Sequence, residues 1–215
     1  MKKVFIHGIG QSNAAWDEMK PHILGEAKYL NLLNFDEESD DIYQELYNML
    51  CKECNKEDGD VHLCGISLGG VMAMQYAIDF PQKVKSLILI NTPYKIPVLL
   101  LKLQKLIFQC TPSIFFNKGF SKKNSIKLIS RIIEKNSWEE IKNIKAKILI
   151  IYGDKDKINK KFAIRLFKET LNSKIVKIEN ANHEINVEQP MKLLEEINIF
   201  WEEIKDYGNR NIINK

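Results

Sequence analysis

The sequence lacks any apolar run long enough to cross a membrane. A spanning helix needs roughly 20 consecutive apolar residues, and no segment here approaches that length. The N-terminal residues Met1 to Gly8 enter a strand-like pattern at once. Their apolar part is too short for the core of a signal peptide, and no small-residue cleavage site follows. We therefore expect a cytoplasmic protein with no membrane partner.

Charge of one sign is also scarce. The chain has 32 Lys and Arg against 28 Asp and Glu, which gives a formal net charge of +4, and we interpret the two signs as mixed along the chain. Proteins that bind nucleic acids usually gather basic residues on one stripe. We therefore expect no nucleic-acid partner. The sequence is not informative about the oligomeric state.

Cysteine is sparse, with Cys51, Cys54, Cys64 and Cys110 the only ones in 215 residues. Without a signal peptide there is no oxidising compartment in which they would pair. Cys51 and Cys54 have the C-x-x-C spacing of a metal or redox site, but no second pair completes a zinc site. We favour two packing residues one helical turn apart. We expect neither a metal nor a cofactor.

Strand-like and helix-like segments alternate along the chain, which predicts an α/β fold with a mostly parallel sheet flanked by helices. Its length suits one buried core. Strands are expected at residues 3–7, 28–34, 60–64, 85–91, 146–152 and 173–178. Helices are expected at residues 16–24, 40–52, 69–80, 159–170 and 190–205.

One segment breaks this alternation. Residues 93–145 are apolar and helical in character and contain no convincing strand, a length far beyond ordinary connections. We interpret them as a helical cap inserted into a core formed by residues 1–92 and 146–215. The cap would cover the carboxyl ends of the strands, where open α/β sheets bind ligands. Ordinary packing of these residues onto one face of the sheet is the alternative.

The most informative motif is G-x-S-x-G at residues 65–69, with Ser67 at its centre. An apolar strand pattern precedes it and an apolar helix pattern follows it. A serine on a sharp turn between a strand and a helix has its hydroxyl exposed above the sheet. The positive N-terminal end of the helix favours negative charge at the same place. Ser67 is therefore the candidate nucleophile.

A serine hydroxyl needs a base to accept its proton and a third group to orient the base. Asp154 and Asp156 follow the strand at 146–152, and His183 follows the strand at 173–178. Parallel strands bring these loops to the same edge of the sheet as Ser67. The chain order Ser, Asp, His is that of α/β enzymes with a serine nucleophile. Either aspartate could be the acid.

These residues, together with the His7-Gly8-Ile9-Gly10 loop after the first strand, give the chain a resemblance to the α/β-hydrolase superfamily over nearly its whole length. It resembles the small capped, cofactor-free esterases that include the pimelyl-acyl-carrier-protein methyl esterases. In such enzymes the acid usually fills the last place of a Gly-x-x-Asp pattern, which favours Asp156 over Asp154. The chain departs from them in lacking an amino-terminal hairpin before the His-Gly loop.

The resemblance also implies an oxyanion hole. Its two donors would be the backbone N–H groups of Leu68, which follows the nucleophile, and of Ile9. We expect His7 and Gly8 to support this loop rather than to react. Gln11 and Ser12 either reach the pocket mouth or shape the turn. We expect His22 and His62 to be packing or surface residues, and Trp16, Trp138 and Trp201 to anchor the core or the cap.

Together these features predict a serine hydrolase that cleaves carboxylic esters or thioesters through a Ser67–His183–Asp156 triad and an acyl-enzyme. The partner would be a small-molecule ester or acyl substrate, because the apolar cap favours such a group. A carbon–carbon bond hydrolase or lyase of the same fold is one alternative. An inactive binding homologue is another.

Overall fold

The computed structural model describes residues 2–36, 38–56, 59–115, 120–134 and 139–213. Within them the chain forms a six-stranded sheet in the order β2-β1-β3-β4-β5-β6, and every neighbouring pair is parallel. The strands are Lys2–Ile6 (β1), Ala27–Leu30 (β2), Val61–Ile66 (β3), Val84–Ile90 (β4), Lys147–Gly153 (β5) and Ser173–Ile178 (β6). This confirms the α/β class and the parallel sheet, while β2 ends four residues earlier than the expected strand at 28–34.

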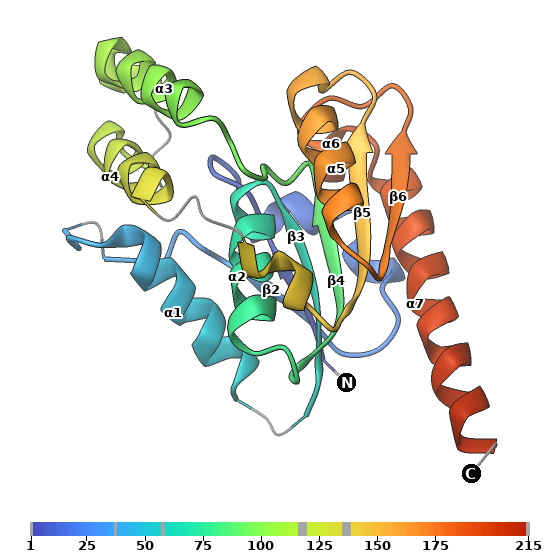
Figure 1. Ribbon diagram of the computed structural model, residues 1–215. Helices are drawn as coiled ribbons and strands as arrows, with labels where there is room; N and C mark the ends of the chain where they lie inside the picture. The colour runs from blue at the N-terminus through green and yellow to red at the C-terminus, as the bar shows by residue number, and fades with distance from the viewer. Residues whose placement is uncertain (1, 37, 57–58, 116–119, 135–138, 214–215) are drawn as a thin grey trace.

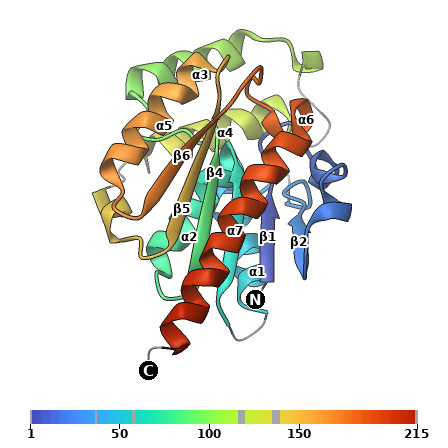
Figure 2. The ribbon, with the colours of Figure 1, turned by 90° about the vertical axis from the view of Figure 1, so that its right-hand side faces the viewer.

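Both faces of the sheet are buried, which explains the near-continuous apolar runs of its strands. In β4, Leu87 and Leu89 pack on one face, and Ile88 and Ile90 pack on the other. Helices Ile42–Cys54 (α1), Leu68–Asp79 (α2) and Lys157–Glu169 (α5) contribute to the core on the first face. The opposite face is covered by Ile185–Glu188 (α6) and Pro190–Ile213 (α7), and α7 runs along it in Figure 2.

The expected helix at residues 16–24 is wrong. Two short 3₁₀ helices, Asn13–Trp16 and Lys20–His22, occupy this region instead. Pro21 explains part of the difference, because proline disfavours a helical conformation in the residue before it and donates no backbone hydrogen bond. Trp16 is fully buried, with its ring 5.2 Å from that of Phe5. It anchors the core, as Trp201 does from α7; Trp138 lies outside the described residues.

Between β4 and β5 the described residues form helices and no strand: α3 (Val98–Cys110), α4 (Lys122–Glu134) and two 3₁₀ helices, Ser113–Phe115 and Glu139–Asn143. In Figure 1, α3 and α4 lie above α1, towards the end of the sheet where the strands finish. Contacts with the α1 region hold α4: the Phe120 ring is 5.0 Å from that of Phe35, and Arg131 forms an ion pair with Asp41.

Candidate active site

Ser67 occupies a strained turn between β3 and α2. Its backbone has φ 53° and ψ −118°, a left-handed conformation that is rare for a residue with a side chain. The Ser67 amide continues the sheet ladder by donating to the Ile90 carbonyl at 3.0 Å, and α2 begins at the next residue. The turn therefore has the strand–serine–helix geometry that exposes a nucleophile above a sheet.

Two glycines let this turn sit against its neighbours. A Cβ atom at Gly69 would lie 2.2 Å from the carbonyl oxygen of Ile6, and one at Gly65 would lie 2.4 Å from the Gly69 backbone. A side chain at Gly69 would push α2 away from β1, and one at Gly65 would push α2 away from β3. This close packing also brings the loop after β1 to the serine, since a Cβ placed on Gly8 would be 3.2 Å from the Ser67 Cβ.

His183 and Asp156 meet at the same end of the sheet. Asp156 Oδ2 lies 2.7 Å from His183 Nδ1, so the imidazole N–H at Nδ1 donates to the carboxylate and leaves Nε2 as an acceptor. Burial tends to raise the pKa of Asp156, but the hydrogen bonds from His183 and Asn159 outweigh it and hold that pKa below its usual value. The carboxylate therefore stays ionised beside the imidazole.

Asp154 has different surroundings. Its amide donates to Ile178 at 3.1 Å, and its Oδ1 is buried without a hydrogen-bond partner among the described residues. Of the two aspartates that the sequence offered, the structure brings only Asp156 into hydrogen-bond contact with His183 among the described residues.

Asn159 is a third member of this cluster that the sequence analysis missed. It stands in the first turn of α5, for which Asp156 is the N-cap. Its Nδ2 atom is 2.7 Å from Asp156 Oδ2 and 3.1 Å from His183 Nδ1. The same carboxylate oxygen thus accepts from both residues. An aspartate at a helix start with an amide three residues later was the signal available in the sequence.

Asn91 connects the loops that carry Asp156 and His183. It follows β4, is fully buried and has φ 39°. Its Nδ2 donates to the Asn182 carbonyl at 2.9 Å and to the His183 carbonyl at 2.8 Å. Its Oδ1 accepts from the Gly153 amide at 3.2 Å. The only sequence signal was a polar residue ending an apolar strand.

The site is accessible and open. Ser67 is half-buried, and the His183 side chain is 44% exposed against 9% for Asp156. No hydrogen bond joins Ser67 to His183 within the described part of the chain. Such contacts are often long in ligand-free enzymes and shorten when substrate binds.

Two backbone amides, those of Ile9 and Leu68, have no hydrogen-bond acceptor among the described residues. The N–H of Leu68 belongs to the first turn of α2, which has no acceptor within the helix. The N–H of Ile9 stands in the loop after β1. Neither donates to another described residue. Both could therefore donate to an oxygen held above Ser67.

His7 supports the loop that carries Ile9. It is fully buried, its Nε2 accepts from the Leu32 amide at 2.9 Å, and its Nδ1 lies 2.8 Å from the Gly8 carbonyl. Burial lowers the pKa of His7, so the ring is neutral with its proton on Nδ1. Both ring nitrogens are engaged by backbone atoms, which suits a structural role.

Gln11 and Asn186 link the same loop to the histidine loop. Gln11 Nε2 donates to Asn186 Oδ1 at 3.1 Å, and Gln11 Oε1 accepts from the Gly8 amide at 3.3 Å. Ser12 instead caps the first 3₁₀ helix by accepting from Ala14 at 3.3 Å. Of the two turn residues, Gln11 thus spans the loops and Ser12 shapes the turn.

The remaining candidates lie elsewhere. His22 is exposed in the second 3₁₀ helix, and His62 is buried in β3. Cys54 packs in the core, where burial raises the pKa of its thiol to about 12 and so disfavours the thiolate that binds metals. No cluster of three His, Cys, Asp or Glu suited to a metal occurs among the described residues.

Comparison with known proteins gives one family. The family model for the alpha/beta hydrolase fold matches residues 4–118. The biotin biosynthesis bifunctional protein BioHC of Teredinibacter turnerae is 34% identical over 95 residues. The match covers 41% of this chain and only 17% of that protein's length.

Solved structures share the fold at low identity. A study of carboxylesterases from the thaumarchaeon Nitrososphaera gargenis provides one with a TM-score of 0.76 at 17% identity, covering 95% of this chain and 91% of the other. MenH from S. aureus has a TM-score of 0.71 at 19% identity, with 95% and 94% covered. At these identities the likeness shows the fold alone.

Proposed function

Because the chain belongs to the α/β-hydrolase fold family, we propose that it is a serine hydrolase that cleaves carboxylic esters or thioesters. The observation that carries the proposal is the 2.7 Å contact of Asp156 with His183 at the end of the sheet where the strained Ser67 turn stands. A base oriented by a carboxylate is what a serine hydroxyl requires to become a nucleophile.

In this mechanism Ser67 Oγ attacks the acyl carbon while His183 Nε2 accepts the hydroxyl proton. Asp156 keeps the imidazole in the tautomer with its proton on Nδ1 and stabilises the imidazolium that forms. The imidazolium then gives its proton to the leaving alkoxide or thiolate, which leaves an acyl-Ser67. Water attacks this acyl group with His183 again as the base, and the carboxylic acid and free serine are released.

The oxygen of the attacked carbonyl becomes negative in both steps. The unengaged amides of Ile9 and Leu68 are the proposed donors to it, and donors about 2.7–3.1 Å from such an oxygen lower the barrier. The N-terminus of α2 adds its positive end at the same place.

The inserted segment 93–145 is the proposed cap. Its apolar character, with Leu and Ile in both long helices and Phe in α3, favours a small or medium acyl group in the substrate. A small-molecule ester is accordingly the expected partner.

A carbon–carbon bond hydrolase or lyase is less well supported. Such a reaction on a carboxylate or dienolate would draw on a cationic side chain. The two arginines near the relevant regions are already paired: Arg131 with Asp41 and Glu134, and Arg165 with Glu169. We therefore favour the ester reaction.

Two measurements test the proposal. Hydrolysis of p-nitrophenyl esters from acetate to palmitate should show turnover that disappears in Ser67→Ala. A fluorophosphonate probe should label the wild-type protein at Ser67, as located by peptide mass spectrometry. Labelling of Ser67 without ester turnover would support Ser67 as the nucleophile but indicate a substrate bond other than an ester. A folded protein that shows neither labelling nor turnover would favour an inactive homologue.

A further inference from the structure

Helix α3 exposes an apolar surface that the fold does not use. Among the described residues of α3, Leu101 alone is buried, with 2% of its surface exposed. On the outside, large apolar side chains are between 39% and 80% exposed: Val98, Leu99, Leu100, Leu103, Leu106 and Ile107. An apolar stripe on a helix normally faces the core. Here it faces outwards.

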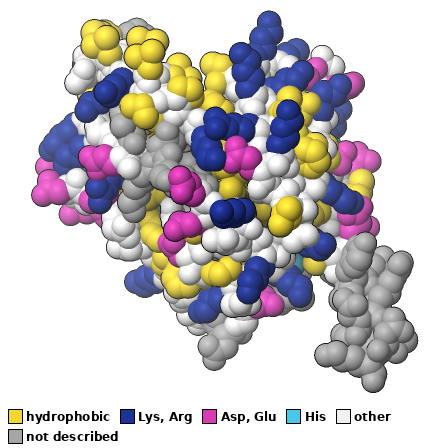
Figure 3. All heavy atoms as spheres, in the orientation of Figure 1, with side chains coloured by type: hydrophobic (Ala, Val, Ile, Leu, Met, Phe, Trp, Pro, Cys, Tyr) yellow, Lys and Arg dark blue, Asp and Glu magenta, His cyan; other side chains and the backbone are white. Residues whose placement is uncertain are grey.

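The exposed residues form a continuous stripe. Leu99, Leu103, Leu106 and Ile107 follow the i, i+4, i+7, i+8 spacing that places side chains on one face of a helix. Ile114, just beyond the helix, is 85% exposed. Figure 3 shows apolar side chains gathered at this upper corner, where Figure 1 places α3. Contiguous apolar patches of this kind mark interaction sites on soluble proteins.

The charge of the segment that contains α3 indicates which kind of partner its apolar stripe would bind. Between Asp79 and Glu134 the sequence contains no Asp or Glu and ten Lys or Arg. The interpretation of the two signs as mixed along the chain is therefore wrong for this segment. Lys102 and Lys105 of α3 form no ion pair with any described residue. Lys102 lies at the edge of the stripe, beside Leu99 and Leu106, whereas the half-buried Lys105 lies one turn from Leu101 on the packed side. The stripe thus has a positive charge at its edge and no negative charge of its own.

A second copy of the chain fits this surface poorly, because a symmetric contact would bring two acid-free, lysine-bearing segments together. An anionic lipid surface supplies both missing features, since its acyl chains accept the leucines and its headgroups attract the lysines. No helix among the described residues is long and apolar enough to span a bilayer, so α3 would lie at the surface of the lipid.

We propose that the exposed face of α3, which we define as Leu99, Leu103, Leu106 and Ile107 with Lys102 at its edge, binds anionic lipid surfaces. This replaces the expectation of no membrane partner. The proposal does not depend on the esterase chemistry. It would nevertheless turn the carboxyl end of the sheet towards the lipid, because α3 lies on that side of the molecule (Figure 1).

The test is flotation of the full chain with phosphatidylcholine vesicles, with and without phosphatidylglycerol. The protein should float with anionic vesicles at low salt, and far less with neutral ones or at high salt. The variants K102E and L103S/L106S should each weaken binding on the order of tenfold, the first because it replaces attraction to the headgroups with repulsion and the second because it removes apolar surface from the acyl chains.

Matched controls separate the α3 face from the rest of the surface. K161E makes the same charge change at an exposed position of α5, and Leu171→Ser removes a leucine that is more exposed than either Leu103 or Leu106, at 89%. Both should bind like wild type. No flotation of wild type with anionic vesicles, or equal losses in controls and α3 variants, would overturn the proposal. So would a dimer in light scattering that L103S/L106S alone dissociates.

Discussion

Each end of the sheet carries a serine and a histidine, and the surroundings of the two pairs differ. At the carboxyl end Ser67 stands on its strained turn and His183 contacts Asp156 at 2.7 Å. At the amino end Ser86 of β4 faces His62 of β3, and its Oγ is 2.7 Å from His62 Nδ1. Among the described residues, the serine hydrogen-bonds to its histidine only at the amino end, which we regard as inert.

Burial and charge explain the inertness of the amino-end pair. Ser86 is fully buried and accepts from Trp201 Nε1 at 3.2 Å. Burial, and then the positive charge of Lys3, lower the pKa of His62 to about 4. No carboxylate hydrogen-bonds to His62 among the described residues. A reactive pair therefore needs a carboxylate on the second imidazole nitrogen and access to substrate.

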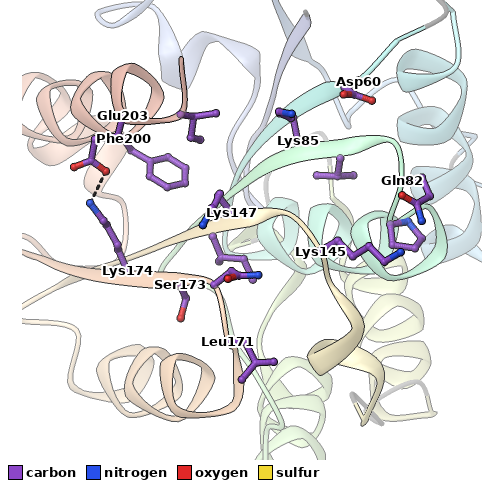
Figure 4. A pocket seen from close by; sticks show the side chains of 15 residues that line it. Asp60, Gln82, Lys85, Lys145, Lys147, Leu171, Ser173, Lys174, Phe200 and Glu203 are labelled. Atoms are coloured by element: carbon purple, nitrogen blue, oxygen red, sulfur yellow. Dashed lines mark hydrogen bonds and ion pairs between the residues drawn. The ribbon is translucent and has the colours of Figure 1, made fainter. Parts of the chain in front are cut away.

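A cavity at the amino end of the sheet does not give a substrate access to Ser86 or His62. It has a volume of about 890 Å³ and lies between the strand starts and α7, where Lys174 pairs with Glu203 (Figure 4). Its lining includes Lys85 and Lys147 but neither Ser86 nor His62. The pair is therefore buried and does not line the cavity.

The largest effect should come from the carboxyl-end serine. Ser67→Ala and His183→Ala should each lower kcat/KM for a p-nitrophenyl ester on the order of 10⁴-fold or more, because both act as one unit. Ser86→Ala should leave kcat/KM nearly unchanged in a folded protein. A comparable loss of kcat/KM in Ser67→Ala and Ser86→Ala would show that the two serines do not differ in function.

The next largest effect should come from replacing Asp156, the proposed acid of the triad. Asp156→Asn should cost about 10³- to 10⁴-fold in kcat, since the amide no longer favours the productive imidazole tautomer. Asp154→Asn is the matched change two residues away and should cost far less. Steady-state kinetics of the two variants decides between them, and a larger loss in Asp154→Asn would reverse the assignment of the acid.

A third prediction concerns stability at the amino end. Because folding lowers the pKa of His62 to about 4, the unfolded chain binds its proton first as the pH falls below the usual value near 6.5. The contribution of neutral His62 to the free energy of unfolding is therefore fully present above pH 6.5, and it is lost as the pH falls from 6.5 towards 4. Between pH 7 and pH 5, wild type should lose about 2 kcal/mol more unfolding free energy than His62→Gln in urea titrations.

Equal pH dependence in wild type and His62→Gln would show that His62 is not held neutral by the fold. His7, whose pKa is also lowered by burial, contributes in the same direction in both proteins and therefore cancels in the comparison.

The smallest effect is expected for Asn91, which joins the loops that carry Asp156 and His183. Asn91→Gly removes the side-chain amide but tolerates the positive φ of this position. We expect a loss on the order of tenfold in kcat with KM little changed, as for other groups that orient a catalytic residue. The pH profile of kcat/KM should shift as well. A purely structural Asn91 would instead lower the melting temperature and leave both kinetic measures unaltered.

Local sequence patterns determined much of this protein. Apolar periodicity placed the strands within a few residues, because burial on both faces of a parallel sheet requires continuous apolar runs. The G-x-S-x-G motif, two aspartates and His183 were all visible as residues that follow strands. Residues 16–24 were mispredicted because apolar spacing outweighed the effect of Pro21.

The contacts across the sheet were decided only by the tertiary structure. Asn91 and Asn159 acquire their partners from loops about 90 and 24 positions away in the chain, and no local pattern encodes such a meeting. The same holds for α3. The sequence predicted helical character in residues 93–145, but only the arrangement of α3 beside α4 leaves its apolar stripe exposed, because burial depends on which neighbours the fold supplies.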